Sequence, residues 1–364
     1  MQRKFSFKKV AYLLFLTSFV SFAQHHETES GSEHMSSKEE IKQEIKADIE
    51  HHIQDSHSFT LFSDKENNKH YGFPLPVILW DDGLQVFSSS KFHHGETIAE
   101  SNGNYYKLYH SKIYKTDAEG AISYDEDHHV SNARPLDFSI TKNVVMIFVV
   151  GILMFLLFAG LAKSFGKGPI ATGAGRFFEP IVIYIRDDIA RPNIGEAKYK
   201  KFMPYLLTVF LFIWFLNLFG LTPLGINVTG NIAITFALAL FTFIITQFSG
   251  NKNYWKHIFW MPGVPVPMKF ILAPIELLGV FIKPFALMIR LYANIMAGHV
   301  VLMSIIALVF IFKNWIGGGL SLFLAFFLSI IELLVAALQA YIFTLLSALY
   351  FGFAVEEHEH DEAH

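Results

Sequence analysis

The sequence contains no cysteine among its 364 residues. Thiol chemistry and cysteine-bound metals are therefore excluded, and the redox compartment cannot be inferred. A phosphate-binding loop of the form GxxxxGK followed by Ser or Thr is also missing, so we expect no nucleotide on this chain. The formal net charge of −3 gives no argument for a nucleic-acid partner, and we expect none. No pattern in the sequence indicates a cofactor.

Charged side chains are also scarce over long stretches of the second half. Hydrophobic residues make up 52% of the chain and the mean hydropathy is +0.36, which favours a membrane protein. The 48 residues from Phe202 to Ser249 carry no charged side chain and are interrupted by Gly and Pro near residues 220–230, so they predict two spans. In all we predict five spans: Val144–Ala162, the two within Phe202–Ser249, Met268–Phe312 and Leu320–Val355.

The first residues resemble a targeting segment. A basic start, including Arg3 and Lys9, precedes an apolar run, Val10–Val20, that is too short to span a bilayer. Small residues lie at the two positions that a signal peptidase reads before Gln24. We predict that residues 1–23 are a cleaved signal peptide. The alternative is an uncleaved anchor helix.

Residues 24–142 are polar and predict a small exported region, either an α+β domain or a loosely ordered extension. Ser36–Ile53 has a helical pattern with a Ser cap. Short strand-like runs follow, separated by turn residues: Phe59–Phe62, Val77–Trp80, Leu84–Ser88 and Tyr105–Tyr109. Several His pairs, such as His93-His94, offer possible metal ligands. Because no ligand spacing recurs, we interpret them as surface residues and expect no metal.

The distribution of basic residues predicts the orientation. Lys and Arg are concentrated between the first two spans, and again after the third, so both loops are expected in the cytoplasm. With five spans, residues 24–142 then lie outside the cell and the tail, residues 356–364, lies inside. Residues 176–194, partly apolar and partly charged, are expected to lie along the membrane interface. A signal peptide before an exported region requires the same topology.

The last two apolar segments are too long for a perpendicular span. Some 40 residues make a helix of roughly 60 Å, twice the hydrocarbon thickness. Such helices must tilt steeply, leave the membrane or bend, and Pro284 offers one position for a bend. We therefore predict an all-α polytopic membrane domain, residues 143–355, that ends in a long and steeply tilted helix hairpin.

Ionisable residues inside these two segments are the main functional signal. Glu276, Lys283 and Arg290 are spaced seven apart, which places them on one helix face. Asn294 follows four residues after Arg290 on nearly the same face. His299 is nine residues beyond Arg290, which puts it on the opposite side of the helix. Arg290 and His299 therefore contact different neighbours.

An antiparallel hairpin of the two segments aligns two polar pairs at once. Pairing Arg290 with Gln339, or His299 with Glu332, places the turn near residue 315 in both cases. A turn signal, residues 313–319, is present there. We infer that His299 and Glu332 form a buried pair, and that Gln339 helps to hold Arg290.

These residue types are suited to ion translocation. Arg does not lose its proton in a protein, so Arg290 is a fixed positive charge that can bind an anionic partner or lower the pKa of a nearby carboxylic acid. His299 and Glu332 can each change protonation, and a buried pair titrates as a coupled unit. In the alternative interpretation, the charged groups pair with one another and serve only the packing of the helices. Intramembrane ionisable residues are, however, functional by default.

Four stretches, taken in order, resemble subunit a of the bacterial F-type ATP synthase membrane sector. They are EPIVIYIRDDIARPNIG (179–195), NLFGLTPLG (217–225), MIRLYANIMAGH (288–299) and LQAYIFTLLSALYFG (338–352). The resemblance covers about residues 137–355. It implies a stator subunit beside a rotating ring of c subunits, each with one membrane-embedded carboxylate.

The resemblance also implies roles for individual residues. Arg290 matches the essential Arg, which attracts the ring carboxylate and blocks proton leak between two half-channels. Asn294 and Gln339 match polar residues near that Arg. His299 and Glu332 match positions that carry Glu and His the other way round in some relatives. Glu276 matches a carboxylate associated with the cytoplasmic half-channel.

The implied partners are the c-ring, the peripheral-stalk b subunits and membrane lipid, in a bacterial inner membrane. ATP chemistry then takes place on another subunit. A stand-alone ion-coupled transporter is the alternative function, but such folds usually contain an internal repeat, which this sequence lacks. A scaffold or receptor that acts through its exported region is a third class, and it would not need ionisable residues within the spans.

Overall fold

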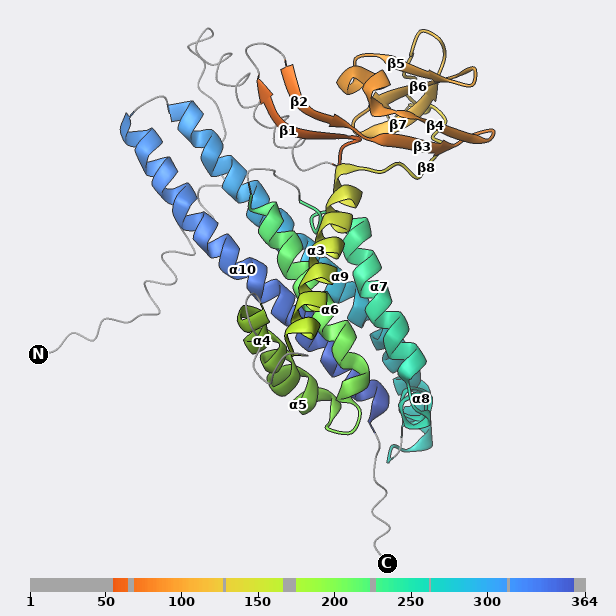
Figure 1. The fold of residues 1–364 in the computed structure, drawn as a ribbon. Helices are drawn as coiled ribbons and strands as arrows, with labels where there is room; N and C mark the ends of the chain where they lie inside the picture. Colours follow the sequence, from red (N-terminus) through yellow and green to blue (C-terminus); the bar gives the residue numbers. More distant parts are fainter. Residues whose placement is uncertain are drawn as a thin grey trace, which may run out of the picture. The chain divides into compact units, whose positions relative to one another are not determined.

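The computed structural model describes residues 55–64, 69–126, 129–165, 175–222, 227–261, 263–312 and 315–356. Residues 55–141 form a β domain and residues 142–355 form the membrane helices (Figure 1). The predicted signal peptide, the predicted helix Ser36–Ile53 and all of the tail beyond Glu356 lie outside the described residues.

The β domain consists of three small antiparallel sheets. One pairs β1 (Ser58–Asp64) with β2 (Lys69–Pro74). The second has the order β4 (Leu84–Ser88), β3 (Pro76–Trp80), β8 (Leu136–Asp137), and the third the order β5 (Ile98–Ser101), β6 (Asn104–Tyr109), β7 (Lys112–Thr116). A 3₁₀ helix, η1 (Ser89–Gly95), follows β4. All four predicted strand runs are therefore strands.

Alternating burial along the strands builds the core of this domain. Val77 and Leu79 of β3 and Phe87 of β4 are buried, while their strand neighbours face outward. They pack in one cluster with side chains from η1 and the third sheet: Phe92, Ala99, Tyr106 and Ile113. The β domain thus has its own hydrophobic core.

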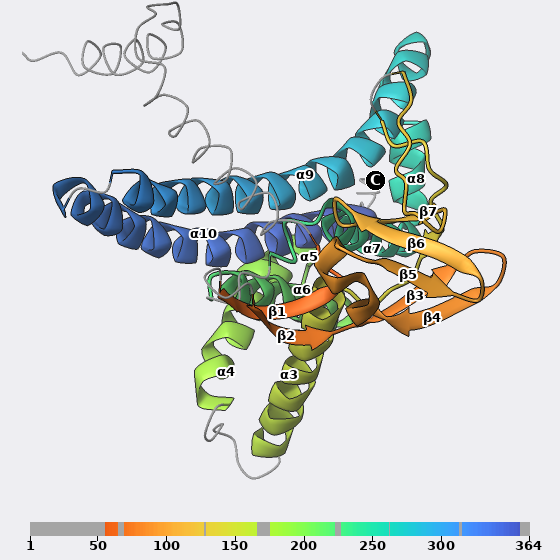
Figure 2. The same cartoon turned by 90° about the horizontal axis from the view of Figure 1, so that it is seen from above.

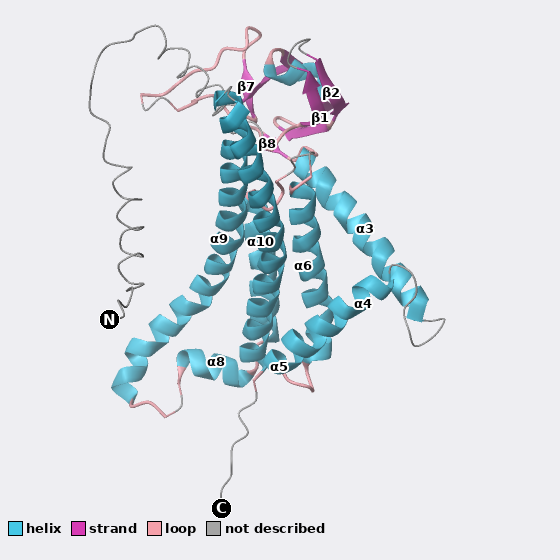
Figure 3. Cartoon of the chain, turned by 90° about the vertical axis from the view of Figure 1, so that its left-hand side faces the viewer, coloured by secondary structure: helices cyan, strands magenta, loops and turns pink. Residues whose placement is uncertain are grey.

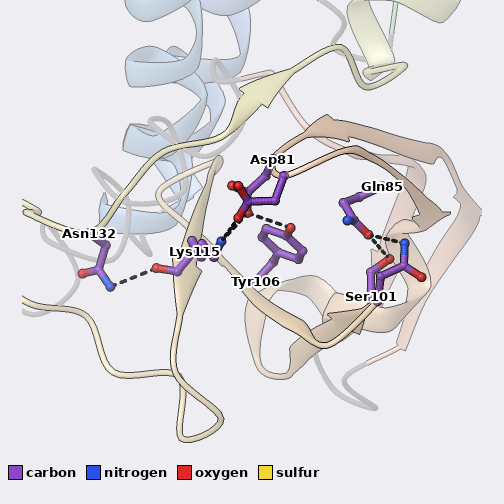
Figure 4. A network of polar contacts seen from close by, with 8 residues as sticks. Asp81, Gln85, Ser101, Tyr106, Lys115 and Asn132 are labelled. Atoms are coloured by element: carbon purple, nitrogen blue, oxygen red, sulfur yellow. Dashed lines mark hydrogen bonds and ion pairs between the residues drawn. The ribbon is translucent and has the colours of Figure 1, made fainter.

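A polar cluster connects the second and third sheets (Figure 4). The ammonium of Lys115 lies 2.9 Å from the carboxylate of Asp81, and the Tyr106 hydroxyl donates to the same carboxylate at 3.0 Å. Burial, followed by this hydrogen bond, raises the pKa of Tyr106 to about 12, so the hydroxyl remains a donor. Nearby, the buried side chain of Gln85 accepts a hydrogen bond from Ser101 at 2.9 Å.

The first described residues attach the β domain to the helix α3 (Lys142–Phe165). The carboxylate of Asp55 accepts a hydrogen bond from the Asn143 amide at 3.3 Å, and the Ser56 carbonyl accepts one from the Lys142 amide at 2.9 Å. These bonds satisfy two amides that a helix start leaves free. The buried His57 ring lies 2.9 Å from the carboxylate of Asp137, which precedes α3.

Replacing Asp137 by Asn should destabilise the β domain and flatten its response to acid. Burial pushes the pKa of the Asp137 carboxyl upward, but hydrogen bonds from His57 and Ser139 together outweigh it and hold the pKa below its ordinary value. Such a carboxylate stabilises the fold above the unfolded pKa of about 4, and this contribution is lost as the pH falls through the folded pKa.

We therefore expect Asp137→Asn to cost about 1–3 kcal/mol at neutral pH, because the uncharged amide has one acceptor oxygen for the two donors, His57 and Ser139, that the carboxylate binds. The cost should shrink as the pH falls through the folded pKa of this carboxyl, because the wild-type group then becomes protonated as well. Thermal unfolding of both proteins across this range measures the difference. An equal cost at both ends of the range would contradict this account of the pair.

Five helices of the described chain are long and apolar enough to cross a membrane, as predicted. They are α3, α6 (Tyr199–Gly220), α7 (Ile232–Ser249), α9 (Val266–Phe312) and α10 (Trp315–Val355). The predicted interfacial stretch is helical and consists of α4 (Gly175–Tyr184), a π-helix η2 (Ile185–Ala190) and α5 (Arg191–Ile194). A short helix, α8 (Lys252–Phe259), connects α7 to α9.

The two longest helices form the predicted hairpin. They lie side by side over much of their length (Figures 1 and 2), and α9 bends away from α10 towards its N-terminal end (Figure 3), the half that contains Pro274 and Pro284. One boundary was wrong: the predicted turn, residues 313–319, is helical from Trp315 onward. Three glycines there do not end the helix, because a helix interior tolerates glycine at a modest cost.

The C-terminal end of α10 is held by side chains from two connecting segments. The Val355 carbonyl accepts hydrogen bonds from the Lys198 ammonium at 2.8 Å and from the Asn251 side chain at 3.0 Å. A cation and an amide at this position satisfy carbonyls that the last helical turn leaves unpaired. One turn earlier, a Cβ on Gly352 would overlap the Asn193 carbonyl, so glycine permits close packing of α5 on α10.

Candidate functional site

Arg290 lies on a face of α9 that the rest of the chain leaves uncovered. Leu287, Leu291 and Ile295 form the buried stripe of this helix, and their spacing of four directs them to the core formed by the other helices. Arg290 and Asn294 belong to a different stripe, and both are exposed. The sequence thus turns the cation away from the chain's own core.

No carboxylate of the described residues lies within ion-pair distance of Arg290. Within the described ranges, its guanidinium makes no ion pair. Only 11% of the apolar stretch of α9 is buried inside the chain, against 44% for α6. Hydrocarbon cannot solvate a guanidinium, since a charge at membrane depth costs several kcal/mol. The site therefore requires a polar or anionic group from outside this chain.

His299 and Glu332 are brought together, as the hairpin register predicted. Nδ1 of His299 lies 3.8 Å from Oε1 of Glu332, with the two side chains only 9% and 11% exposed. Gly298 makes this approach possible, because a Cβ at that position would lie 3.1 Å from the same carboxylate oxygen. The two helices thus enclose one coupled pair of ionisable groups.

Gln339 is buried on α10, and no hydrogen bond joins it to Arg290 among the residues that the structure describes. Near Gln339 lies a path of polar groups that was not predicted from the sequence. The Thr229 hydroxyl donates to the Asn217 side chain at 2.7 Å, and the Asn217 amide donates to the Ala336 carbonyl at 3.4 Å. Asn217 and Thr229 are both buried, so neutral polar groups lead from the α6–α7 connection to α10.

Glu276 lies on α9, partly exposed and far from the other site residues. Along the helix it precedes Arg290 by 14 residues, or roughly 21 Å, whereas His299 follows Arg290 by roughly 14 Å. Beside this end, a small pocket between α7, α9 and α10 has polar lining residues, including Thr246, Gln247, Lys283, Tyr254 and Tyr350. Ionisable groups therefore lie on both sides of Arg290 along α9.

Three polar residues could be recognised from sequence only as neutral interruptions of apolar runs: Asn217, Thr229 and Thr246. Of their hydrogen bonds, the one from Asn217 to the Ala336 carbonyl joins helices that are far apart in the chain. No group of three or more His, Asp or Glu converges as a metal site in the described part.

Comparisons with known proteins agree on one family. The family model described as ATP synthase A chain matches residues 144–352, and a domain of unknown function (DUF8433) matches residues 48–138. ATP synthase subunit a 2 of Chlorobaculum tepidum is 45% identical, over 63% of this chain and 66% of the relative. ATP synthase subunit a of Chloroherpeton thalassium is 43% identical, over 63% and 70%. ATP synthase subunit a 2 of Prosthecochloris aestuarii is 38% identical, over 80% and 94%.

Proposed function

Because the chain belongs to the ATP synthase A chain family, we propose that it conducts protons to and from the carboxylates of a rotating c-ring, as the stator subunit of an F-type ATP synthase. Two half-channels lead to the ring, and Arg290 is the fixed charge between them. The observation that carries this proposal is the exposed guanidinium on a long helix that its own chain leaves mostly uncovered. A ring carboxylate supplies the missing anion.

The arrangement of ionisable groups along α9 supports two separate paths. The buried His299–Glu332 pair, together with Asn217 and Thr229, lies towards the connection between α9 and α10. Glu276 and the polar pocket lie towards the opposite end. Arg290 lies between the two sets. A proton entering by either path must therefore reach the other path on a ring carboxylate that turns away from Arg290, because the guanidinium exchanges no proton and keeps the carboxylate facing it ionised.

The remaining assignments complete this proposal. Asn294 and Gln339 orient the guanidinium once the ring is bound, and b subunits of the peripheral stalk bind to this chain. The protein is placed in a bacterial inner membrane, with the β domain outside and the C-terminus in the cytoplasm, after removal of residues 1–23. The concentration of Lys and Arg in the α3–α6 and α7–α9 connections supports this orientation.

Passive proton flux tests the proposal against a stand-alone transporter. We would reconstitute the purified chain alone, the c-ring alone, and the assembled membrane sector into vesicles, and then impose a potential with potassium and valinomycin. The pH change inside the vesicles reports proton entry. We expect flux only from the assembled sector, because neither half-channel crosses the membrane without the ring.

Carbodiimide modification of the ring carboxylate serves as the control and should block this flux. Flux through the chain alone that is insensitive to carbodiimide would overturn the proposal in favour of a transporter.

A further inference from the structure

The second sheet of the β domain has an apolar outer face that the described chain does not cover. Its strands direct Val77, Leu79 and Phe87 into the core, so alternate residues point outward. The outward set is large, apolar and in each case more than half exposed: Trp80 57%, Leu84 56%, Val86 58%, Leu136 62% and Phe138 65%. We call these five residues the apolar sheet face.

The strand register makes this face continuous. Trp80 pairs with both Leu84 of β4 and Leu136 of β8, and Val86 pairs with Ile78. The Phe138 amide donates to the Ile78 carbonyl at 2.9 Å, which places Phe138 beside Ile78. Among the described residues, no position that points outward with these five on the three strands is charged. A contiguous apolar surface of this kind usually marks an interaction site.

The position of the apolar sheet face in the chain points to lipid as its partner. Phe138 precedes the first residue of α3 by four positions, which span at most about 14 Å. The interfacial layer on each side of the hydrocarbon is about 5–7 Å thick. The sheet cannot move far from this layer, because Asp55 and Ser56 bind the first amides of α3.

The lipid-facing surface of α3 begins close to this point. Phe148, Ile152 and Phe155 of α3 are at least 60% exposed, as expected for side chains in contact with hydrocarbon. An apolar sheet face and an apolar helix surface therefore lie on either side of the start of α3, within a short stretch of chain. Trp and Phe are also suited to the interface, where an apolar ring is partly buried among headgroups.

We propose that the apolar sheet face docks on the surface of the bilayer that α3 crosses. Burial of its side chains among the headgroups and upper acyl chains drives docking, and the absence of charge on the face makes docking independent of anionic lipid. The β domain is thereby held flat against the membrane beside α3. This role lies outside proton conduction, so it stands or falls independently of the proposed function.

Single-cysteine labelling tests this docking, because the chain has no cysteine of its own. Val86→Cys and Leu84→Cys each place a bimane fluorophore on the face, and Glu100→Cys places one on an exposed position of the third sheet. The assembled complex, with reactive cysteines of its other subunits replaced, is reconstituted into phosphatidylcholine vesicles. Quenching is measured with a lipid that carries a nitroxide near its headgroup, and with iodide in the water.

We expect labels at Val86 and Leu84 to be quenched several-fold more by the lipid nitroxide than the label at Glu100, and several-fold less by iodide. Equal iodide quenching at all three positions would mean that the face lies in water, and would overturn the proposal. Protection from both quenchers would mean that protein covers the face, either residues 24–54 or another subunit, and would overturn it as well.

Discussion

Replacing Arg290 by Ala should abolish proton-driven ATP synthesis while the complex still assembles. A guanidinium close to a carboxyl lowers its pKa by about 1–3 units, so removing it lowers the ratio of ionised to protonated carboxyl at the facing ring site by about ten- to thousandfold. The ring carboxylate then stays protonated as it passes the stator, and protons cross without driving synthesis. ATP synthesis by inverted vesicles, measured alongside their passive proton leak, tests this expectation.

Two further variants show whether position or charge alone matters. Lys269→Gln removes a cation from the same face of α9, 21 residues before Arg290 and outside the polar pocket, and should retain most synthesis. Arg290→Lys keeps the charge but loses the planar donor fork, so we expect little recovery. Normal synthesis by Arg290→Ala in a fully assembled complex would contradict the role assigned to this residue.

Separating the His299–Glu332 pair should produce the second-largest effect. Nδ1 of His299 and Oε1 of Glu332 lie 3.8 Å apart and both side chains are nearly buried, so each has an ionisable neighbour in the other. A positioned acid–base group contributes about a hundredfold or more to a proton transfer. We expect His299→Ala or Glu332→Gln to slow proton flux on the order of a hundredfold.

The exchanged double variant, His299→Glu with Glu332→His, distinguishes a functional pair from a packing contact. It restores one carboxylate and one imidazole at the same site, and we expect it to recover part of the flux that either single variant loses. His257→Ala, on the short helix α8, is a matched control that should leave flux unchanged. A double variant no better than the single ones would refute the coupled pair.

The hairpin could be predicted from sequence because one quantity, the depth of each residue along the two helices, determines its register. Two apolar runs joined by a short connection must lie antiparallel, and equal depth then determines which residues are level. This register places His299 beside Glu332, and the structure confirms the contact. The same helical periodicity separates Arg290 from His299, and in the structure the first is exposed while the second is buried.

Contacts between distant helices could not be predicted in this way. The hydrogen bond from Asn217 to the Ala336 carbonyl depends on how α6 approaches α10, which no local pattern specifies. In the β domain, the turn at Asn102 and Gly103 has a clear sequence signal, because both residue types favour the positive φ that they adopt there. The next hairpin turns at His110-Ser111, also with positive φ, and β7 was not predicted because this pair carries no such signal.

We expect Arg290 to face an acidic site on a moving partner. A structure of the assembled, membrane-embedded complex measures this most directly, as the separation between the Arg290 guanidinium and the nearest c-ring carboxylate. Our account predicts that in at least one rotational state the two groups lie within ion-pair range, about 4 Å. A ring positioned against another face of this chain, with Arg290 in contact with lipid or with a different subunit, would contradict it.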